Sequence, residues 1–572
     1  MRERRLLTTE ERAELEQRGC IADNWDDVQV APEFEVTQLR NVRFEGQVSI
    51  GAKSRITDAV ICNYAIGDNC LIESVTRMEC RHSTRFGEGV RVSAVNENGG
   101  REVVIYRNLT AQCAYLMAMM RHNKAATNAL AVLAEDAAER RRSEQGIVAD
   151  NVRIIGVKFL REVLVEQEAT IEGASLLENG TVGRRATVGV DVRAEDFIFA
   201  EDSKVKGGAI VERCYVGANT ILSNGFTAVD SLFFANCHCE NGEAAAIFAG
   251  PYTVSHHKSS LLIAGVFSFF NAGSGTNQSN HLFKSGAVHQ AIHMRGTKFG
   301  SNAYVMAPAI EGPYTVILGR HTRHHDLQDM PYAYLIEENG QSSLLPAMAL
   351  TSYGAVRDTE KWKTRDKRTE KRDNIRFEEF NPFLTGKMLR GVDALTRMRE
   401  NDPEAKTYTY NRTVIKASML ARGIKLYNSA IAASLGAMLS AGRHTSTAPC
   451  DGEWIDLAGQ YLPLAIVEQI LDQAANNSLT LDGLHETLDK AMAEYEDMAA
   501  TYAYSTLARL MGHQPSAEEV RETITAGENI LARMRETTDN DRRRDAGEDM
   551  WIGYGYDFRE VDVREQDFKN TR

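Results

Sequence analysis

The feature that most constrains this chain is a short phrase that recurs along its first half. An aliphatic residue is followed by glycine and then by polar or small residues. The phrase begins at Ile50, Ile66, Val182, Val188 and Val216. A strand this short buries only one inward side chain, so it must stack on its neighbours to form a core. Glycine allows backbone conformations that let the chain turn a corner between strands. The phrase therefore predicts a solenoid.

These repeats resemble the hexapeptide repeat of left-handed parallel β-helices, in which three hexapeptides form one triangular coil. The resemblance implies a mainly β fold, a left-handed parallel β-helix that occupies residues 41–106 and 147–350. From Phe226 onward the phrase degenerates, and we expect irregular coils with long loops there. An irregular all-β domain is the alternative that the same glycines leave open.

A helical insertion is expected between the two parts, at residues 107–146. This interval is rich in alanine and methionine and ends in Arg140, Arg141 and Arg142. Alanine favours helices, and cations suit a helix C-terminus. Such an insertion either packs against the coils or shapes a site or a subunit contact.

Helical spacing dominates residues 381–572, which predicts an α-helical C-terminal domain. We expect helices over 455–475, 481–511 and 515–535, and Ser516 can cap the last of these.

Three further segments complete the organisation. Residues 1–40 form an N-terminal segment, and residues 351–380 contain a charge-dense stretch that indicates an exposed connector. The aromatic segment 551–558 is expected to pack on the body or on a neighbouring subunit.

Composition and charge exclude several classes of protein. The 572 residues are 43% hydrophobic and 25% charged, as in globular proteins, and the net charge of −13 does not favour nucleic acid or an anionic membrane. The N-terminal segment lacks the apolar core of a signal peptide, and no stretch approaches the roughly 20 apolar residues of a membrane span. The nine cysteines are scattered. We therefore expect a cytoplasmic protein with reduced thiols.

Nine of the fourteen histidines lie between residues 238 and 325. One phrase there contains His256, His257 and Lys258, and adjacent histidines in a strand point to opposite faces, so one of the two is expected to face a site. The second phrase, 273–281, is composed of glycine, hydroxyl and amide residues before His281. It offers donors to a phosphate or an oxyanion, or it is a surface loop held by its own turns.

The phrases at 250–259 and 275–281, together with Gly286, His289 and Gln290, resemble the core of the bacterial DUF4954 family. The resemblance covers most of the β-helical part and implies a hexapeptide-repeat protein of unestablished function. More distantly, the repeats resemble those of hexapeptide acyltransferases and of the β-helical domains of sugar nucleotidyltransferases. No glycine-rich nucleotidyltransferase signature lies near the N-terminus.

The acyltransferase resemblance implies a mechanism in which a neutral histidine removes a proton from an acceptor while backbone N–H groups stabilise the oxyanion. His256 or His257 is the expected base, and His281 is the next candidate. The expected substrate-binding residues are Lys258, Asn277, Gln278, Asn280, His289 and His293. The acceptor is a sugar or sugar-nucleotide, the donor is acyl-CoA, and the resemblance implies a homotrimer.

Two alternatives to a transferase stay open. One is a non-catalytic binding or assembly protein that recognises a phosphorylated sugar or nucleotide, and the other is a relative of sugar nucleotidyltransferases. Whether the protein is an enzyme is therefore open, and no cofactor beyond acyl-CoA is implied. The groups at 237–239 and 321–326 contain metal-ligand residue types without a zinc signature, so no metal site is predicted.

Overall fold

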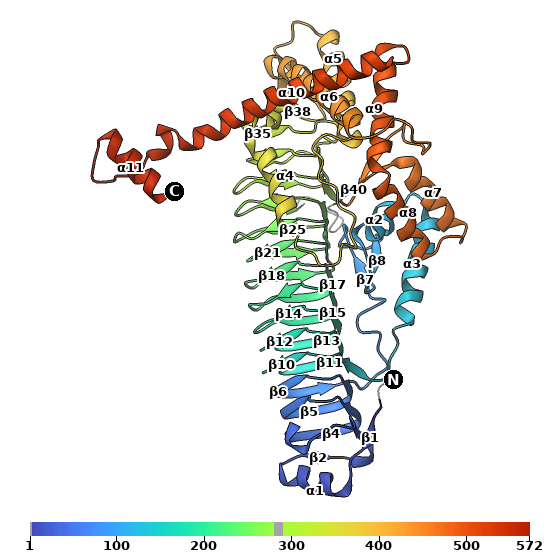
Figure 1. The fold of residues 1–572 in the computed structure, drawn as a ribbon. Coiled ribbons are helices and arrows are strands. Elements are labelled where there is room, and N and C mark those ends of the chain that lie inside the picture. The colour runs from blue at the N-terminus through green and yellow to red at the C-terminus, as the bar shows by residue number, and fades with distance from the viewer. Residues whose placement is uncertain (1–2, 280–289) are drawn as a thin grey trace.

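The structure is a computed structural model that describes residues 3–279 and 290–572. Its main body is a parallel β-solenoid of about 18 turns, with helices beside it and over its far end (Figure 1). The expected mainly β fold with additional helices, including a C-terminal helical region, is confirmed. Within the described part of the chain, no helix is long and apolar enough to cross a bilayer.

Successive turns of the solenoid stack in register. Leu160 lies beside Leu177, and Leu177 lies beside Ala194, a step of 17 residues. The first turns contain β2 (Ile21–Ala22), β3 (Val28–Val30), β4 (Leu39–Ile50), β5 (Arg55–Ile66), β6 (Leu71–Glu79), β9 (Gly146–Val148), β10 (Arg153–Ile155), β11 (Phe159–Val165), β12 (Thr170–Glu172), β13 (Leu176–Val182), β14 (Thr187–Val188), β15 (Arg193–Phe199), β16 (Lys204–Val205) and β17 (Ile210–Val216). α1 (Thr9–Gln17) lies at the N-terminal end (Figure 1).

The register continues beyond Phe226, where irregular coils were expected. Thr227 pairs with Glu243, and Glu243 pairs with Leu261. The later turns contain β18 (Ile221–Ser223), β19 (Thr227–Val229), β20 (Leu232–Phe233), β21 (His238–Glu240), β22 (Glu243–Ala245), β23 (Phe248–Ala249), β24 (Val254–Ser255), β25 (Leu261–Ile263), β26 (Gly265–Phe267), β27 (Asn271–Ala272), β28 (Asn277–Ser279), β29 (Ala291–His293), β30 (Lys298–Phe299), β31 (Tyr304–Met306), β32 (Ile310–Glu311), β33 (Val316–Leu318) and β34 (Arg320–His321). Ladder hydrogen bonds and one inward side chain per strand define these turns, so they persist after the glycine phrase fades.

The repeat glycines serve close packing between turns. A Cβ on Gly183 would lie 2.6 Å from the carbonyl oxygen of Phe199 in the next turn. The left-handed backbone falls two residues later, at Arg185 with φ 57°. The corner itself is therefore made by a residue with a side chain, and the glycine lets the neighbouring coil approach.

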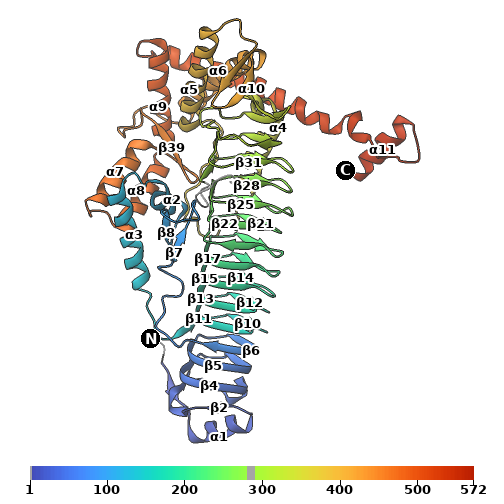
Figure 2. The same cartoon turned by 180° about the vertical axis from the view of Figure 1, so that it is seen from behind.

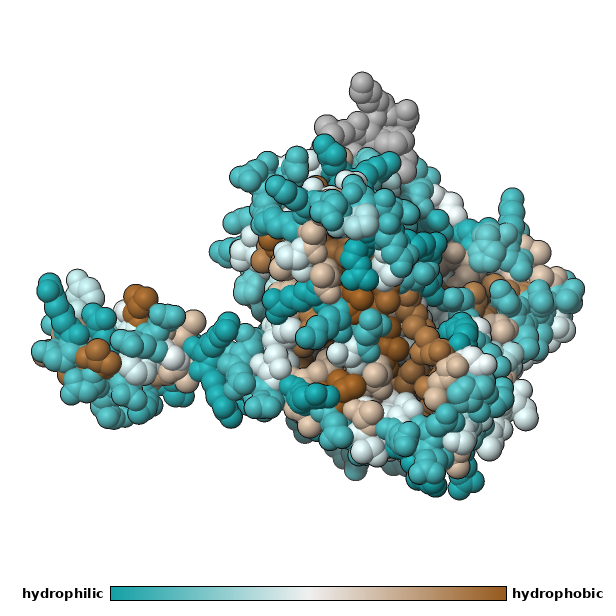
Figure 3. Space-filling view, turned by 90° about the horizontal axis from the view of Figure 1, so that it is seen from above, coloured by the Kyte–Doolittle hydropathy of each residue, from teal (hydrophilic) through white to brown (hydrophobic). Residues whose placement is uncertain are grey.

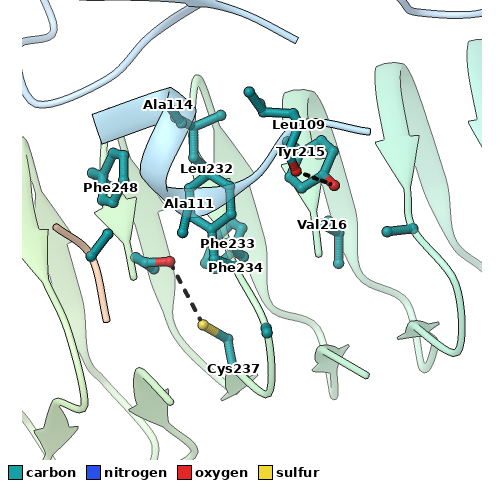
Figure 4. Close-up of a cluster of buried hydrophobic side chains, with 14 of the residues drawn as sticks. Leu109, Ala111, Ala114, Tyr215, Val216, Leu232, Phe233, Phe234, Cys237 and Phe248 are labelled. Atoms are coloured by element: carbon teal, nitrogen blue, oxygen red, sulfur yellow. Dashed lines mark hydrogen bonds between the residues drawn. The ribbon is translucent and has the colours of Figure 1, made fainter. Parts of the chain in front are cut away.

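The helical insertion packs against one face of the solenoid. It consists of α2 (Ala111–Met119) and α3 (Lys124–Glu139), preceded by the hairpin of β7 (Arg91–Ser93) and β8 (Glu102–Val104). Figure 4 shows Ala111 and Ala114 of α2 beside the aromatic residues of the solenoid. The Tyr215 hydroxyl donates a hydrogen bond of 2.9 Å to the carbonyl of Leu109 just before α2.

The C-terminal region covers the end of the solenoid and then runs back along its side (Figures 1 and 2). A hairpin of β35 (Tyr334–Glu338) and β36 (Gln341–Leu345) closes the coils. The helices that follow are α4 (Tyr353–Arg365), α5 (Pro382–Asn401), α6 (Ala417–Ala441), α7 (Leu464–Ala475), α8 (Leu481–Ala493), α9 (Tyr495–Met511), α10 (Ala517–Arg543) and α11 (Val561–Thr571). β37 (Thr407–Tyr410) and β38 (Thr413–Lys416) add a second hairpin, which pairs with β36.

The structure corrects one expectation about this region and confirms another. The prediction of a helix over 455–475 is wrong in its first part, because β39 (Trp454–Leu457) and β40 (Gln460–Pro463) form a hairpin there. Gly459, with φ 118°, makes its turn, and the helix begins only at Leu464. The expected Ser516 cap is confirmed. Its hydroxyl accepts the Glu519 N–H, and the Glu519 carboxylate accepts the Ser516 N–H.

The charge-dense connector is partly buried, although an exposed segment was expected. After α4 it continues as a strap, residues 366–376, in which Arg368 and Asp373 are buried. The guanidinium of Arg368 binds the Asp366 carboxylate at 2.8 Å, and Asp373 accepts the N–H of Ala111 at 2.8 Å. These charges can be buried because each one has a partner within the fold.

Candidate functional site

The structure places the histidine pair expected to supply the base on an outer corner of the solenoid. His256 and His257 follow β24 in a turn, so their rings lie side by side at 4.3 Å between centroids instead of on opposite faces of a strand. His257 and Lys258 are exposed, and His256 is half-buried.

A third histidine that sequence reasoning did not select joins this corner. The ring of His238 in β21, one turn below, lies 5.7 Å from that of His256, and its Nε2 lies 3.1 Å from a Glu240 carboxylate oxygen. Burial and the two neighbouring histidines lower the pKa of His256, which favours its neutral form at pH 7. A neutral imidazole is the form that can accept a proton.

The remaining predicted residues lie elsewhere. Asn277 and Gln278 are consecutive in β28 and therefore point to opposite faces, and Gln278 is fully buried inside the coil. His293 is also fully buried. Asn280, His281 and His289 lie outside the described residues. The structure thus separates the His256 corner from the interior pair, Gln278 and His293.

His293 belongs to a polar column inside the solenoid. The inward column that holds Phe233, Ala249 and Phe267 continues with His293 and Glu311. Apolar residues therefore give way to ionisable ones in the last turns.

Glu311 is fully buried and lies between two histidines. His293 Nδ1 approaches one carboxylate oxygen at 2.5 Å, and His325 Nε2 approaches the other at 2.7 Å. Burial acts to raise the pKa of Glu311, but the two histidines outweigh it and lower this pKa to about 2. Each ring faces its own carboxylate oxygen, and among the described residues no three His, Cys, Asp or Glu side chains are arranged to hold a metal ion.

A cavity lined with arginines lies between the solenoid and the end of α3. Its volume is about 630 Å³. The insertion, the solenoid and the strap each supply arginines, namely Arg107, Arg140, Arg141, Arg142, Arg184 and Arg372. Three carboxylates, Glu166, Glu201 and Glu370, also line it. Two more, Glu88 and Glu139, pair with Arg141 and Arg142 from outside the lining, so six arginines face five carboxylates and the formal charge is +1.

The three carboxylates hold some of these arginines in place. Arg107 pairs with Glu166 at 2.6 Å, and Arg372 pairs with Glu201 at 3.0 Å. Arg140 is exposed and has no ion-pair partner among residues 3–279 and 290–572. Arg107 and Arg140 also line an adjoining cavity of about 500 Å³. Guanidinium groups of this kind bind phosphate or carboxylate through paired N–H donors.

Comparison with known proteins decides the family. The sequence model described as Domain of unknown function (DUF4954) matches residues 4–59 and 54–399, well over half of the chain. The chain belongs to the DUF4954 family. The expected membership is confirmed, whereas these findings do not test a link to hexapeptide acyltransferases.

The DUF4954 match ends before the last helices. A second model, Domain of unknown function (DUF6819), matches residues 437–572. An uncharacterized protein of Treponema pallidum (strain Nichols) is 21% identical over 447 residues, which are 67% of this chain. The chain spans about 60% of the length of that curated relative.

The arginine cavity of this DUF4954 protein was missed by sequence reasoning. The triplet at 140–142 was noticed, but it was interpreted as a helix C-terminus. Arg107, Arg184 and Arg372 are far apart in sequence, and only the stacking of the insertion and the strap on the solenoid brings them together. The three adjacent arginines were the one feature of the sequence that could have indicated an anion site.

Proposed function

We propose that this DUF4954 protein binds a small molecule carrying one or more phosphates in the arginine-lined cavity. The observation that carries the proposal is the convergence of six arginines from three parts of the chain on one cavity with a surplus of positive charge. A volume of about 630 Å³ lies in the range of small-molecule sites, roughly 300–1,000 Å³. A phosphorylated sugar or a nucleotide has this size and charge.

The ion pairs favour a preformed site. Glu166 and Glu201 orient Arg107 and Arg372 before any ligand arrives, which reduces the entropy lost on binding. Arg140 remains available for a new anion. Because the lining is half-exposed, binding should weaken as the salt concentration rises.

Calorimetry and thermal unfolding of the full chain test this proposal. Pyrophosphate, a nucleoside diphosphate sugar and CoA are the probes. A ligand at 100 times its Kd should add about 2.7 kcal/mol to the free energy of unfolding. The double variant Arg107→Gln, Arg140→Gln should lose at least tenfold in affinity. Arg193→Gln, an exposed arginine paired with Glu195 on the solenoid, is the matched control and should bind as the wild type does. Failure of all three probes to bind the wild type would contradict the proposal.

The acyltransferase hypothesis is a second proposal, favoured by the lowered pKa of His256 beside His257 and His238. In it, His256 accepts the proton of a sugar hydroxyl or amine, that oxygen or nitrogen bonds to the thioester carbonyl carbon, and the CoA thiolate leaves and takes up a proton. An acyl-CoA probe in the same screen separates the two proposals. Release of free CoA thiol that needs both a sugar acceptor and His256 supports transfer, whereas binding without release supports a binding protein.

A further inference from the structure

A second cavity, at the helical end of the molecule, has largely apolar walls. Its volume is about 560 Å³, and it lies between α4, α6, α9 and α10. The apolar lining includes Leu350, Val356, Phe377, Met438, Leu531 and Met534. Figure 3, which views this end from above, shows hydrophobic residues gathered in a depression. The volume is in the range of small-molecule sites, roughly 300–1,000 Å³.

This cavity is distinct from the arginine cavity and is not covered by the end of the chain. Of the residues that the structure describes, none lines both cavities. The part of α10 that forms a wall ends at Thr538. The expected packing of 551–558 on the body of its own chain is not observed, because the chain projects away from the body beyond α10 (Figures 1 and 2). The cavity is therefore accessible to a ligand.

The charges of the lining differ with depth. The half-buried groups are one guanidinium, Arg376, and three carboxylates, Glu378, Glu379 and Glu496, with a formal charge of one minus three, or −2. Arg376 binds Glu378 at 2.8 Å and Glu496 at 2.6 Å, so its charge is shared by two carboxylates. The exposed groups have a formal charge of two minus one, or +1, and are Lys363, Arg535 and Glu360. Water and salt screen exposed charges more than buried ones, so the inner part of the cavity is negative.

Glu379 is the half-buried carboxylate that lacks a cation. No basic side chain within residues 3–279 and 290–572 forms an ion pair with it. Burial raises the pKa of Glu379, and the Thr359 hydroxyl and the more distant charges of Lys363 and Arg535 offset only part of this effect. A carboxylate in such a place is stabilised by a cation that comes close to it.

The rings of Phe377 and Phe380 line the same cavity as Glu379. An aromatic face attracts a cation through its quadrupole, so these rings favour the same kind of ligand. We propose that this cavity binds a small molecule with an apolar body and a protonated amine, and that the amine pairs with Glu379. An anion of the same shape would bring its charge beside the half-buried carboxylates. The proposal does not depend on phosphate binding, because the two cavities are separate.

Three probes with the same ten-carbon chain test the charge preference. Decylamine is cationic, decanol is neutral and decanoate is anionic, and each is titrated below its micellar concentration into the full chain by calorimetry. Decylamine should bind about tenfold more tightly than decanoate, since a charge-assisted contact replaces a repulsion. A wild type that binds decanoate as tightly as decylamine, or that does not bind decylamine, would overturn the proposal.

Glu379→Gln tests the position of the amine. This substitution keeps the shape of the side chain and removes its charge, so the affinity for decylamine should fall about tenfold while that for decanol is unchanged. Glu360→Gln is the matched control, because Glu360 is an exposed carboxylate of the same lining and should change the affinity less than about twofold. An unchanged affinity for decylamine in Glu379→Gln would show that the amine binds elsewhere.

Met534→Gln tests the apolar wall. Met534 lines the cavity and is half-buried, and glutamine has nearly its length. Decylamine and decanol should both lose about threefold in affinity, because apolar contact is replaced by an amide. Met511→Gln, at a 38% exposed methionine that ends α9, is the control and should bind both probes as the wild type does. Equal affinities in the two variants would place the chain outside this cavity and overturn the assignment.

Discussion

At the scale of the residue, Arg295 joins the solenoid to the C-terminal region. It is 1% exposed, and its guanidinium donates to the Asp456 carboxylate at 2.7 Å and to the carbonyl oxygens of Arg376 and Gly459. The rings of Phe269 and Tyr461 lie 4.0 and 4.4 Å from its central carbon. One buried cation thus binds the last turns, the strap and the β39–β40 hairpin together.

Replacing this cation should loosen the C-terminal region. Arg295→Met leaves the Asp456 carboxylate, whose side chain is 9% exposed, without its partner, and we expect the free energy of unfolding to fall by about 3 kcal/mol. Urea denaturation measures the change. Arg320→Met is the control, since Arg320 lies over the Tyr304 ring at 4.8 Å but is exposed, and it should cost less than about 1 kcal/mol. Equal losses in both variants would contradict this role.

His321 makes stability depend on pH. Burial and the neighbouring His325 lower the pKa of His321 to about 4, from an ordinary value near 6.5. The unfolded chain therefore binds this proton more readily, so the stabilisation is complete above about pH 6.5 and is lost as the pH falls toward 4. The lowered pKa of Glu311 acts in the same direction at still lower pH, from about 4.5 to about 2.

Thermal unfolding at pH 7 and pH 5 checks this expectation. The unfolding midpoint of the wild type should be lower at pH 5 than at pH 7, and this decrease should be smaller in His321→Gln. His122→Gln, at an exposed histidine of the insertion, should retain the full dependence of the wild type. A His321→Gln variant with an unchanged pH dependence would assign the effect to other groups.

At the scale of the element, each turn depends on close contact with the next. The repeat phrase predicted a glycine after each aliphatic residue but wrongly assigned it to the corner. Its reason could not be predicted, because a Cβ on Gly183 would clash with the carbonyl of Phe199, 16 residues later. The hairpin of β39 and β40 was mistaken for helix for a similar reason. All four residues of β40 are buried, and Arg295 of the solenoid donates to the Gly459 carbonyl in the turn of the hairpin, a contact that no local pattern reports.

The turn contact gives a direct prediction. Gly183→Ala places a Cβ 2.6 Å from a backbone oxygen that cannot move without shifting the coil, so we expect a loss of about 2 kcal/mol. Gly452→Ala is the matched control, because a Cβ there meets nothing within 4 Å and its backbone needs no left-handed φ. Urea denaturation measures the free energy of unfolding of both variants. A Gly183→Ala variant as stable as Gly452→Ala would contradict the prediction and show that the coils can separate.

At the scale of the whole molecule, the solenoid acts as a rigid surface on which distant segments meet. The insertion and the C-terminal region lie on the same side of the coils, where Gln112 of α2 donates to the carbonyl of Asn374 in the strap at 2.9 Å (Figure 2). The arginine cavity arises between these parts.

The sequence by itself determined the solenoid, the helical insertion and the helical C-terminal region, because stacking of short strands and helical periodicity are local properties repeated along the chain. It also pointed to histidines in the later turns. Only the tertiary structure decided that Gln278 and His293 face the interior, that His238 joins His256, and that Arg107, Arg184 and Arg372 share one cavity. The physical reason is that these groupings depend on which turn lies above which and on where the strap crosses the coils, and both are set by contacts between residues far apart in sequence.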